Sequence, residues 1–285
     1  MRIILTGSTG FIGKALLAYL RSVGIDVVCI GRLSGNIVLS KQLEKVGRID
    51  GCIHLASLFL SSHSEEQVAP IVSSNVAFGT QVVDAAVRLG CRWFINTGTY
   101  WTHYNDCAYS PVNLYAATKQ AFSDILVYYR ESAGLRTVTL ELTDTYGPDD
   151  PRKKLIGKWC EILNSSQELL MSTGKQEVEL VHRDDVVRAF LLLANLLNDN
   201  DDRVPGVGEV YSLPTGEVMP LKELAYVFEH ATGGCLPIIW GGRQERPREM
   251  MKVVHHGRVI PGWKPSISLL KGFSEVYASY LYDSQ

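Results

Sequence analysis

The strongest constraint on the fold is a glycine loop near the start of the sequence. The segment ILTGSTGFIGKALL places Gly7, Gly10 and Gly13 between a run typical of a β-strand (residues 2–6) and an amphipathic helical stretch (residues 11–22). Gly7 permits a tight turn, Gly10 lets a pyrophosphate approach the backbone, and Gly13 lets the helix pack closely on the sheet. The helix start adds free N–H groups and the positive end of the helix dipole. This context predicts a dinucleotide-binding βα unit; the alternative is an ordinary glycine-rich turn.

The rest of the first half alternates short apolar runs with longer amphipathic stretches. Strands are predicted at residues 26–30, 52–56, 92–96 and 137–142, and helices at residues 68–89 and 114–133. Strands that are separated by helices indicate a parallel sheet covered on both faces. We therefore predict an α/β fold, a Rossmann-like doubly wound parallel sheet, for residues 1–147.

The pattern becomes looser after the segment YGPDDP. Helices are predicted at residues 153–163 and 184–197, with the strand-like run QEVELV between them, and the turn-rich tail ends in another helix. This indicates a smaller C-terminal domain over residues 148–285, which we expect to bind substrate. Part of it, near residues 176–200, is expected to return to the sheet.

Composition argues against several classes of protein. The 285 residues carry 28 Lys and Arg against 30 Asp and Glu, so the net charge of -2 offers no basic surface for nucleic acid or an anionic membrane. The most apolar segment, AFLLLANLL, is too short to span a bilayer, and the first apolar run is too short for a signal peptide. The six cysteines and seven histidines show no CxxC or HExxH spacing. We therefore expect a cytoplasmic enzyme with reduced, packed cysteines and no metal site.

The end of the second predicted strand bears on the cofactor. In NAD-binding sites of this kind an Asp or Glu holds the ribose 2′-hydroxyl at this point, whereas the segment VVCIGRLSGN carries Gly31 and Arg32 and no acid. A guanidinium matches a 2′-phosphate. The sequence therefore favours NADPH over NAD, and the alternative is that Arg32 is a solvated surface residue.

A second motif, SPVNLYAATKQAF, places Tyr115 and Lys119 four residues apart on one face of the predicted helix. A nearby ammonium favours the phenolate form of a tyrosine and would lower its pKa toward neutral. The segment FINTGTYW, just upstream, would present the hydroxyl of Thr97 or Thr99 at the carboxyl edge of the sheet, where ligands bind. We interpret the pair as a proton donor with its electrostatic partner; the alternative is a plain amphipathic helix.

Taken in order, these motifs resemble those of the extended short-chain dehydrogenase/reductases, also called the NAD-dependent epimerase/dehydratase family. The segments that carry the resemblance are TGSTGFIG (6–13), HLAS (54–57), NVAFGT (75–80), NTGT (96–99), YAATK (115–119), TYGPDD (145–150), VHRDDVVRAF (181–190) and GWKP (262–265). The resemblance implies that Tyr115 is the acid/base and that Lys119 binds the nicotinamide ribose and depresses the tyrosine pKa. It assigns the hydroxyl beside the reacting oxygen to Thr99, with Thr97 as the alternative.

The same resemblance implies a set of cofactor contacts from the glycine loop, the strand ends and the catalytic helix. They are Gly7, Thr9, Gly10, Phe11, Ile12, Gly13, Arg32, Leu55, Ala56, Asn75, Thr97, Tyr115 and Lys119. His54 either lines the cofactor or is a core residue.

Members of this family use one centre for several reactions. The 4,6-dehydratases carry Asp-Glu after the catalytic Thr, whereas Tyr100 and Trp101 follow Thr99 here, which disfavours elimination. Epimerases keep NAD tightly bound, whereas Arg32 favours an exchangeable NADPH and hence net reduction. A 4-epimerase, a non-catalytic NADP-binding regulator and a reductase of an unrelated carbonyl remain as alternatives.

Four segments resemble a narrower group, the bacterial CDP-abequose and CDP-paratose synthases. They are FINTGTYW, SPVNLYAATKQAF, DTYGPDDPRKKL and GGRQERPREMMK. This resemblance implies NADPH-dependent reduction of the C4 keto group of a nucleotide-linked 4-keto-6-deoxyhexose, specifically a CDP-4-keto-3,6-dideoxyhexose for O-antigen and lipopolysaccharide sugars.

The family pattern also suggests where the nucleotide sugar binds. Asp144 stands where the family has an Asn that contacts substrate, and Glu141 stands where it has an Arg. Guanidinium groups suit phosphate oxygens, so Arg243, Arg246 and Arg248 are candidate ligands of the nucleotide diphosphate, ahead of Lys153 and Lys154. The resemblance further implies a homodimer whose interface is a four-helix bundle made by helices 68–89 and 114–133.

Overall fold

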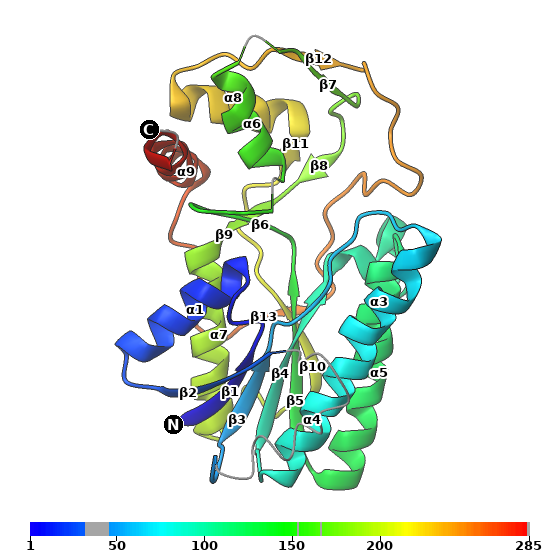
Figure 1. The fold of residues 1–285 in the computed structure, drawn as a ribbon, viewed down its shortest axis with the longest axis vertical. Helices are drawn as coiled ribbons and strands as arrows, with labels where there is room; N and C mark the ends of the chain where they lie inside the picture. The colour runs from blue at the N-terminus through cyan, green and yellow to red at the C-terminus, as the bar shows by residue number, and fades with distance from the viewer. Residues whose placement is uncertain (32–45, 153, 166, 284–285) are drawn as a thin grey trace.

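The computed structural model describes residues 1–31, 46–152, 154–165 and 167–283 (Figure 1). Its centre is a seven-stranded sheet in the order β13-β10-β5-β4-β3-β1-β2, in which all neighbouring strands are parallel. The strands are β1 (Arg2–Thr6), β2 (Asp26–Ile30), β3 (Gly51–His54), β4 (Trp93–Thr99), β5 (Arg136–Leu142), β10 (Val207–Ser212) and β13 (Arg258–Val259). The predicted Rossmann-like sheet is confirmed.

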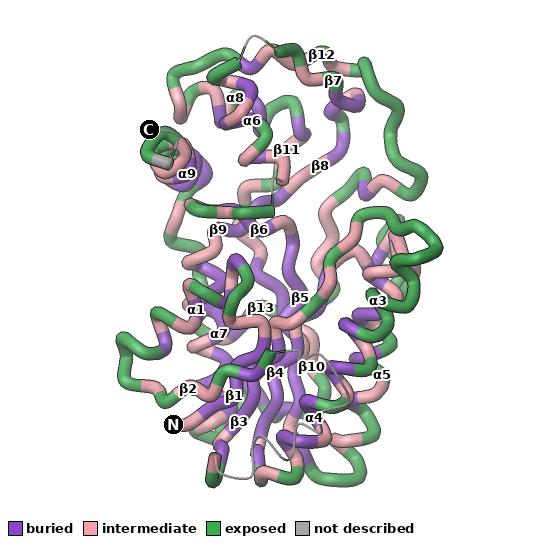
Figure 2. Tube along the Cα trace, in the orientation of Figure 1, coloured by how far each residue is buried: buried purple, intermediate pink, exposed green. Residues whose placement is uncertain are grey.

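The order of the strands locates the ligand crevice. From β1 the chain continues to β2 on one side, whereas β3 pairs with β1 on the other. Ligands of open α/β sheets bind outside the carboxyl ends of the strands where the order reverses in this way. The strands at this point are buried on both faces, as Figure 2 shows in purple, because helices cover the sheet from both sides.

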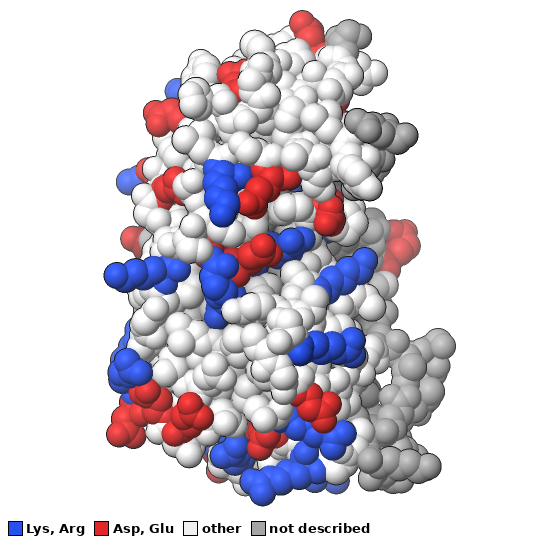
Figure 3. Space-filling model, turned by 90° about the vertical axis from the view of Figure 1, so that its left-hand side faces the viewer, with Lys and Arg blue, Asp and Glu red and all other residues white. Residues whose placement is uncertain are grey.

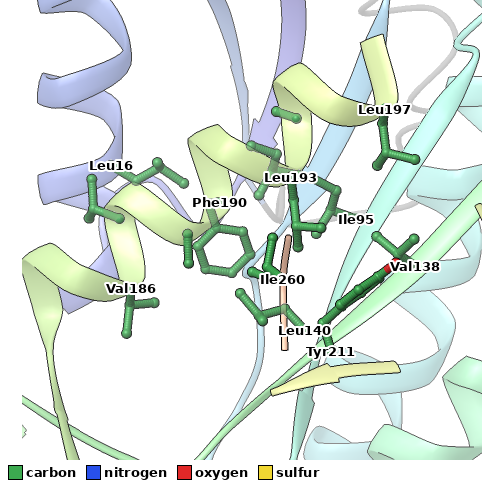
Figure 4. Packing of buried hydrophobic residues seen from close by; sticks show 14 of the residues in the cluster. Leu16, Ile95, Val138, Leu140, Val186, Phe190, Leu193, Leu197, Tyr211 and Ile260 are labelled. Atoms are coloured by element: carbon green, nitrogen blue, oxygen red, sulfur yellow. The ribbon is translucent and has the colours of Figure 1, made fainter. Parts of the chain in front are cut away.

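Within the described part of the chain, four long helices cover the sheet. They are α1 (Phe11–Ser22) and α7 (Arg183–Asn198) on one face, and α4 (Phe78–Arg88) and α5 (Leu114–Ala133) on the other. Figure 4 shows how α7 packs: Val186, Phe190, Leu193 and Leu197 recur every three or four residues and form one apolar stripe. Phe190, Leu193 and Leu197 are fully buried in this cluster. Their periodicity explains why the segment folds as a helix against the sheet.

The helix expected over residues 68–89 differs in one respect. The structure has three consecutive segments, namely α3 (Val68–Val72), the π-helical segment η2 (Ser73–Ala77) and α4, preceded by the short helix η1 (Glu65–Gln67). Single π turns inside α-helices are rare and often lie at functional sites. Here the π turn contains Asn75, whose side chain is buried.

A smaller layer of helices and short strands lies beyond the carboxyl edge of the sheet (Figure 1). Its helices α6 (Leu155–Leu163), α8 (Leu221–Thr232) and α9 (Leu269–Asp283) enclose a separate apolar cluster that includes Trp159, Phe228 and Phe273. The short strands form three pairs: β6 (Asp144–Tyr146) with β9 (Leu180–His182), β7 (Leu169–Met171) with β12 (Ile238–Trp240), and β8 (Glu177–Val178) with β11 (Met219–Pro220). Two 3₁₀ turns, η3 (Tyr100–Thr102) and η4 (Tyr104–Asp106), follow β4.

The C-terminal half returns to the sheet in more than one place. Within the range 176–200, helix α7 packs on the sheet, whereas β8 and β9 pair with short strands outside it. The strands that extend the sheet come later, as β10 and β13. A division after residue 147, which we retain as a proposal, therefore separates two stretches of sequence that share one sheet.

Surface and cysteine chemistry are ordinary in the described part of the chain. Basic and acidic side chains are interspersed over the face shown in Figure 3. No helix among the described residues is both long and apolar enough to cross a membrane.

The six cysteines are all free. Cys52, Cys91 and Cys160 are buried, as expected of packing residues. Cys29, Cys107 and Cys235 are exposed, so the expectation of packed cysteines was wrong for these three.

Candidate functional site

The glycine loop has the geometry of a phosphate cradle. Gly7 has a φ of 69°, and a Cβ there would lie 2.7 Å from the backbone nitrogen of Ala56. A Cβ on Gly13 would lie 2.0 Å from the carbonyl oxygen of Gly7, so only glycine allows α1 to approach the loop this closely. Gly10 caps α1 without any side-chain hydrogen bond and is exposed. The helix start therefore offers free N–H groups to an anion, and the residues present fit a dinucleotide pyrophosphate.

The other predicted contacts around the loop differ in exposure. Thr9 is exposed, Phe11 is buried, and Ile12 packs on the edge of the apolar core. Leu55 and Ala56 are half-buried beyond the end of β3, and the backbone N–H of Ala56 donates to the hydroxyl of Thr6 over 3.1 Å. Arg32 lies outside the described residues, so the structure leaves its predicted contact as a prediction.

Two arginines that the sequence analysis did not assign lie beside the loop. The guanidinium carbon of Arg152 is 4.3 Å from the ring centre of Phe11, and that of Arg183 is 5.3 Å away. Arg152 is oriented by two bonds of 2.6 Å to Asp150, and Arg183 by a bond of 2.7 Å to the carbonyl of Pro148. Both lie within segments already quoted for the family resemblance, DTYGPDDPRKKL and VHRDDVVRAF, but no spacing rule pointed to these two residues. They add positive charge next to the phosphate cradle.

Tyr115 and Lys119, the predicted catalytic pair, both lie on α5. Asn113 caps the helix by accepting a hydrogen bond from the N–H of Ala116 over 3.0 Å, which fixes the first turn that carries Tyr115. Lys119 follows one turn later and is 3 % exposed, and burial lowers the pKa of its ammonium to about 8. No carboxylate forms an ion pair with Lys119 among the residues that the structure describes.

The pKa of Tyr115 moves in the direction opposite to the one expected from the sequence. Burial raises it to about 12, and the hydroxyl of Ser57 and the charge of Arg152 offset this only in part. Lys119 is not among the groups that shift this pKa, and desolvation of the phenolate is the largest cause. At neutral pH Tyr115 carries its proton, which is the state that a general acid requires.

The two threonines at the end of β4 have different partners. The Thr97 hydroxyl donates to the backbone carbonyl of His54 over 2.9 Å, so its proton is committed to the neighbouring strand. The Thr99 oxygen accepts from the N–H of Trp101 over 3.3 Å, and its own proton has no acceptor among the described residues. Of the two hydroxyls, that of Thr99 can therefore still donate a hydrogen bond to a ligand. It lines, with Lys119 and Glu141, a small cavity of about 200 Å³ between α5 and the sheet.

His54 is a core residue. Its Nδ1 is 2.8 Å from the hydroxyl of Thr6, and its ring lies 5.2 Å from that of Phe122 and 5.9 Å from that of Phe94. Burial and the nearby charge of Lys119 lower its pKa to about 3, so the imidazole is neutral. Of the two readings offered by the sequence, the structure favours the core role.

The side chain of Asn75 is fully occupied within the protein. Its amide oxygen accepts from the N–H of Leu58 over 2.7 Å and from Ser57 over 3.2 Å, and its amide nitrogen donates to the carbonyl of Leu58 and to Thr118. These four bonds use the whole capacity of the group. The π turn therefore ties the segment after β3 to the catalytic helix, a positioning role that the motif NVAFGT did not reveal.

A cleft of about 1160 Å³ lies between the carboxyl edge of the sheet and the smaller layer, and it gathers the predicted substrate ligands. Its lining includes Asp144, Arg243, Arg246 and Arg248. The side chain of Arg248 binds the loop before α5, through bonds of 3.1 Å to the carbonyl of Pro111 and 2.7 Å to the hydroxyl of Ser110. Among the described residues, the side chain of Arg243 has no hydrogen-bond or ion-pair partner, and the guanidinium of Arg246 lies 4.0 Å from the carboxylate of Glu249. Arg243 and Arg246 are thus the freer cations of the three.

Aromatic side chains line the part of this cleft that is nearest to Tyr115. The ring of Phe59 meets that of Tyr115 edge to face at 5.0 Å and that of Trp101 at 5.5 Å. Next to them the hydroxyl of Tyr100 donates to Asp144 over 3.2 Å, and the ammonium of Lys154 lies 3.6 Å from the same carboxylate. In the sequence, Tyr100 and Trp101 stood out only as replacements for an acid pair, and no pattern pointed to Phe59.

His255 and His256, which are adjacent in the sequence, point to different partners. His255 binds Glu179 over 2.5 Å, whereas His256 stacks on His103 at 4.1 Å and binds Asp106 over 3.1 Å. Among the described residues, no group of His, Cys, Asp and Glu is placed to hold a metal ion.

A parallel sheet, a glycine cradle at its first turn and a Tyr–Lys pair on the helix beside its carboxyl edge together define a dinucleotide-binding type of α/β fold. The NAD dependent epimerase/dehydratase family model matches residues 3–210, and the chain belongs to this family.

The chain is similar to curated and solved relatives over nearly its whole length. It is 29% identical to the CDP-abequose synthase of Salmonella typhimurium, with 96% of each chain covered, and 28% identical to that of Yersinia pseudotuberculosis, with 88% of this chain and 91% of the relative covered. Its fold matches that of MoeE5 in complex with UDP-glucose and NAD, with a TM-score of 0.85, 21% identity and 100% of each chain covered.

Proposed function

We propose that this protein catalyses NADPH-dependent reduction of the C4 keto group of a nucleotide-linked 4-keto-6-deoxyhexose, and specifically of a CDP-4-keto-3,6-dideoxyhexose. The observation that carries the proposal is the position of Tyr115, a neutral, half-buried phenol whose ring contacts Phe59 in the lining of a cleft with aromatic and arginine side chains. Full-length similarity to CDP-abequose synthases supports the choice of substrate. The product would serve O-antigen and lipopolysaccharide synthesis in the cytoplasm.

The cofactor would lie across the glycine cradle and the carboxyl ends of β1, β3 and β4. Residues 7–13 would hold the pyrophosphate through backbone N–H groups, and Lys119 would hold the nicotinamide ribose. When bound, the nicotinamide supplies the hydride that the carbonyl carbon receives. The choice of NADPH depends on Arg32. Replacing Arg32 by Ala should weaken NADPH binding at least tenfold and leave NADH binding unchanged, as measured by nicotinamide fluorescence.

The chain's own residues handle the oxygen and the proton. As the carbonyl oxygen gains negative charge, Tyr115 transfers its phenolic proton to it, which leaves an alcohol and a phenolate. Thr99 donates a hydrogen bond to the same oxygen, and the charge of Lys119 favours the phenolate that forms. Solvent returns one proton to Tyr115, so each turnover consumes one NADPH, one proton and one ketone.

The substrate's nucleotide diphosphate would bind in the cleft. Arg243 and Arg246 are the candidate phosphate ligands because their guanidinium groups line the cleft and are the least committed to protein partners. Arg248 contributes by anchoring the loop that precedes α5. Asp144, which is held by Tyr100 and Lys154, is positioned to accept a hydrogen bond from a sugar hydroxyl.

NADPH oxidation against a panel of 4-keto sugar nucleotides tests the proposal, with the product configuration determined by NMR. We expect turnover that is greatest with the CDP-linked dideoxy sugar. Bound NAD with epimerised product and no net NADPH consumption would instead identify a 4-epimerase. Tight NADPH binding without turnover of any substrate would identify a regulator.

We also propose that the protein forms a homodimer through α3, α4 and α5. Val68 and Val72 on α3 and Val127 and Tyr128 on α5 are exposed apolar side chains that a four-helix bundle would cover. Sedimentation should give a mass of about twice the 31.6 kDa of one chain. A monomer at micromolar concentration would contradict this interface.

A further inference from the structure

The most unusual surface in the cleft is formed by Phe59 and Trp101, which we call the aromatic wall. Phe59 is 41 % exposed, although its ring meets the rings of both Tyr115 and Trp101. An exposed aromatic side chain inside a cleft marks a surface that a ligand covers more often than a packing site. Because Phe59 contacts the proton donor itself, the ligand group that covers the wall lies close to the reacting carbon.

The wall presents no hydrogen-bonding group on Phe59, and only one on Trp101, the indole N–H. A sugar hydroxyl placed against it would lose its bonds to water without replacement, whereas a methylene or methyl group would gain apolar contact. The surface next to the proton donor therefore favours carbon atoms that lack oxygen.

A polar cluster adjoins the wall. Asp144 receives a hydrogen bond from Tyr100 over 3.2 Å and has the ammonium of Lys154 at 3.6 Å, and that ammonium lies 4.8 Å from the ring centre of Phe59. The cleft thus has an apolar side and a polar side that meet at Lys154. A ring with oxygen on one edge and none on the other matches this division.

On this basis we infer that Phe59 and Trp101 are specificity-determining residues that select sugars deoxygenated beside the reacting carbonyl, while Tyr100, Asp144 and Lys154 bind a remaining hydroxyl. The inference rests on the proposed function, and it adds which residues distinguish a sugar that lacks this hydroxyl from one that carries it. An apolar surface rejects an added hydroxyl by up to about 100-fold, so discrimination of about 10- to 100-fold is expected.

The test compares two ketones that carry the same nucleotide, a 4-keto-6-deoxyhexose and a 4-keto-3,6-dideoxyhexose, with kcat/KM measured for each. The wild type should prefer the dideoxy sugar by about 10- to 100-fold. Phe59→Ser and Trp101→Ser should each reduce this ratio by about fivefold or more, since they remove apolar contact and admit water. The matched control is Tyr226→Ser, an exposed aromatic residue on α8 outside the cleft, which should leave the ratio unchanged.

Two further measurements separate specificity from damage. NADPH affinity should stay within about twofold in both wall variants, which shows that fold and cofactor site are intact. Binding of the two corresponding C4 alcohols, measured by calorimetry, should show the same loss of preference without any turnover.

The outcomes distinguish the two proposals. If the wild type reduces both ketones equally, or if neither wall variant changes the ratio, the wall is not a specificity determinant although the reductase assignment stands. If the wild type reduces neither ketone and binds neither alcohol, the proposed function fails, and the inference fails with it.

Discussion

Replacement of Lys119 by Met should make the protein more stable and less active. The ammonium is 3 % exposed, and burial lowers its pKa from 10.5 to about 8. Because one pKa unit corresponds to about 1.4 kcal/mol, the folded state bears a cost of about 3 kcal/mol for keeping this charge at neutral pH. Methionine has a similar length and no charge, so the variant should gain most of that amount in its free energy of unfolding at pH 7.

The dependence on pH follows from the sign of the shift. Below about pH 8 the lysine is protonated in both states, so the folded wild type bears the full cost. As the pH rises from about 8 toward 10.5, the folded state releases this proton before the unfolded state does, and wild-type stability recovers relative to the variant. The advantage of Lys119→Met should therefore shrink from about 3 kcal/mol at pH 7 to below about 1 kcal/mol near pH 10.

The assay is urea unfolding, followed by circular dichroism, for wild type, Lys119→Met and Lys158→Met at both pH values. Lys158 is an exposed lysine on α6 whose pair with Glu161 contributes less than about 1 kcal/mol, so its variant controls for loss of charge alone. Other groups that titrate in alkali are common to all three proteins and cancel in the differences. A Lys119→Met protein less stable than wild type at pH 7, or an advantage that does not change with pH, would refute the reasoning.

Three further outcomes are expected. Tyr115→Phe should lower kcat by about 10²- to 10⁴-fold while NADPH affinity stays within about twofold, as steady-state kinetics and fluorescence titration will show, and retention of full activity would contradict the assigned role. Gly13→Ala should abolish cofactor binding, because its Cβ would lie 2.0 Å from the Gly7 carbonyl oxygen. The control is Gly157→Ala on α6, where no atom lies near the added Cβ. This variant should bind the cofactor normally, and its free energy of unfolding should rise by about 0.5–1 kcal/mol. Phe190→Ala should cost about 3–5 kcal/mol in urea unfolding, since this fully buried ring fills the core between α7 and the sheet; a cost below about 1 kcal/mol would contradict that packing.

Elements with local start and stop signals could be predicted from the sequence. Helix α5 spans residues 114–133 as predicted, because Asn113 caps its start and Gly134, with a φ of 64°, ends it. The glycine loop was equally accessible, since its constraints act within a few residues. By contrast, no helical period encodes the π turn at residues 73–77 or the bonds that its Asn75 makes to Leu58 and Thr118.

The chemistry of the site depended on partners distant in sequence. Burial is the largest cause that raises the pKa of Tyr115, and Lys119, to which the sequence spacing pointed, is not among the causes. The resemblance ranked Thr99 ahead of Thr97, but their different partners, the carbonyl of His54 for Thr97 and the N–H of Trp101 for Thr99, are visible only in the structure. Arg248 resembled its neighbours as a phosphate ligand until its bonds to Ser110 and Pro111 were seen.

The strand order has a consequence for how such a protein can be divided. β5 is the last strand that the N-terminal half contributes to the sheet. One edge of β5 pairs with β4 of the same half, and the other pairs with β10 from the C-terminal half. A fragment of residues 1–147 would expose that edge together with apolar side chains such as Val138 and Leu140, which is the template that drives aggregation. Residues 1–147 are therefore not expected to form a transferable module, because truncation or recombination at this boundary would separate them from β10 and β13, the strands that complete their sheet.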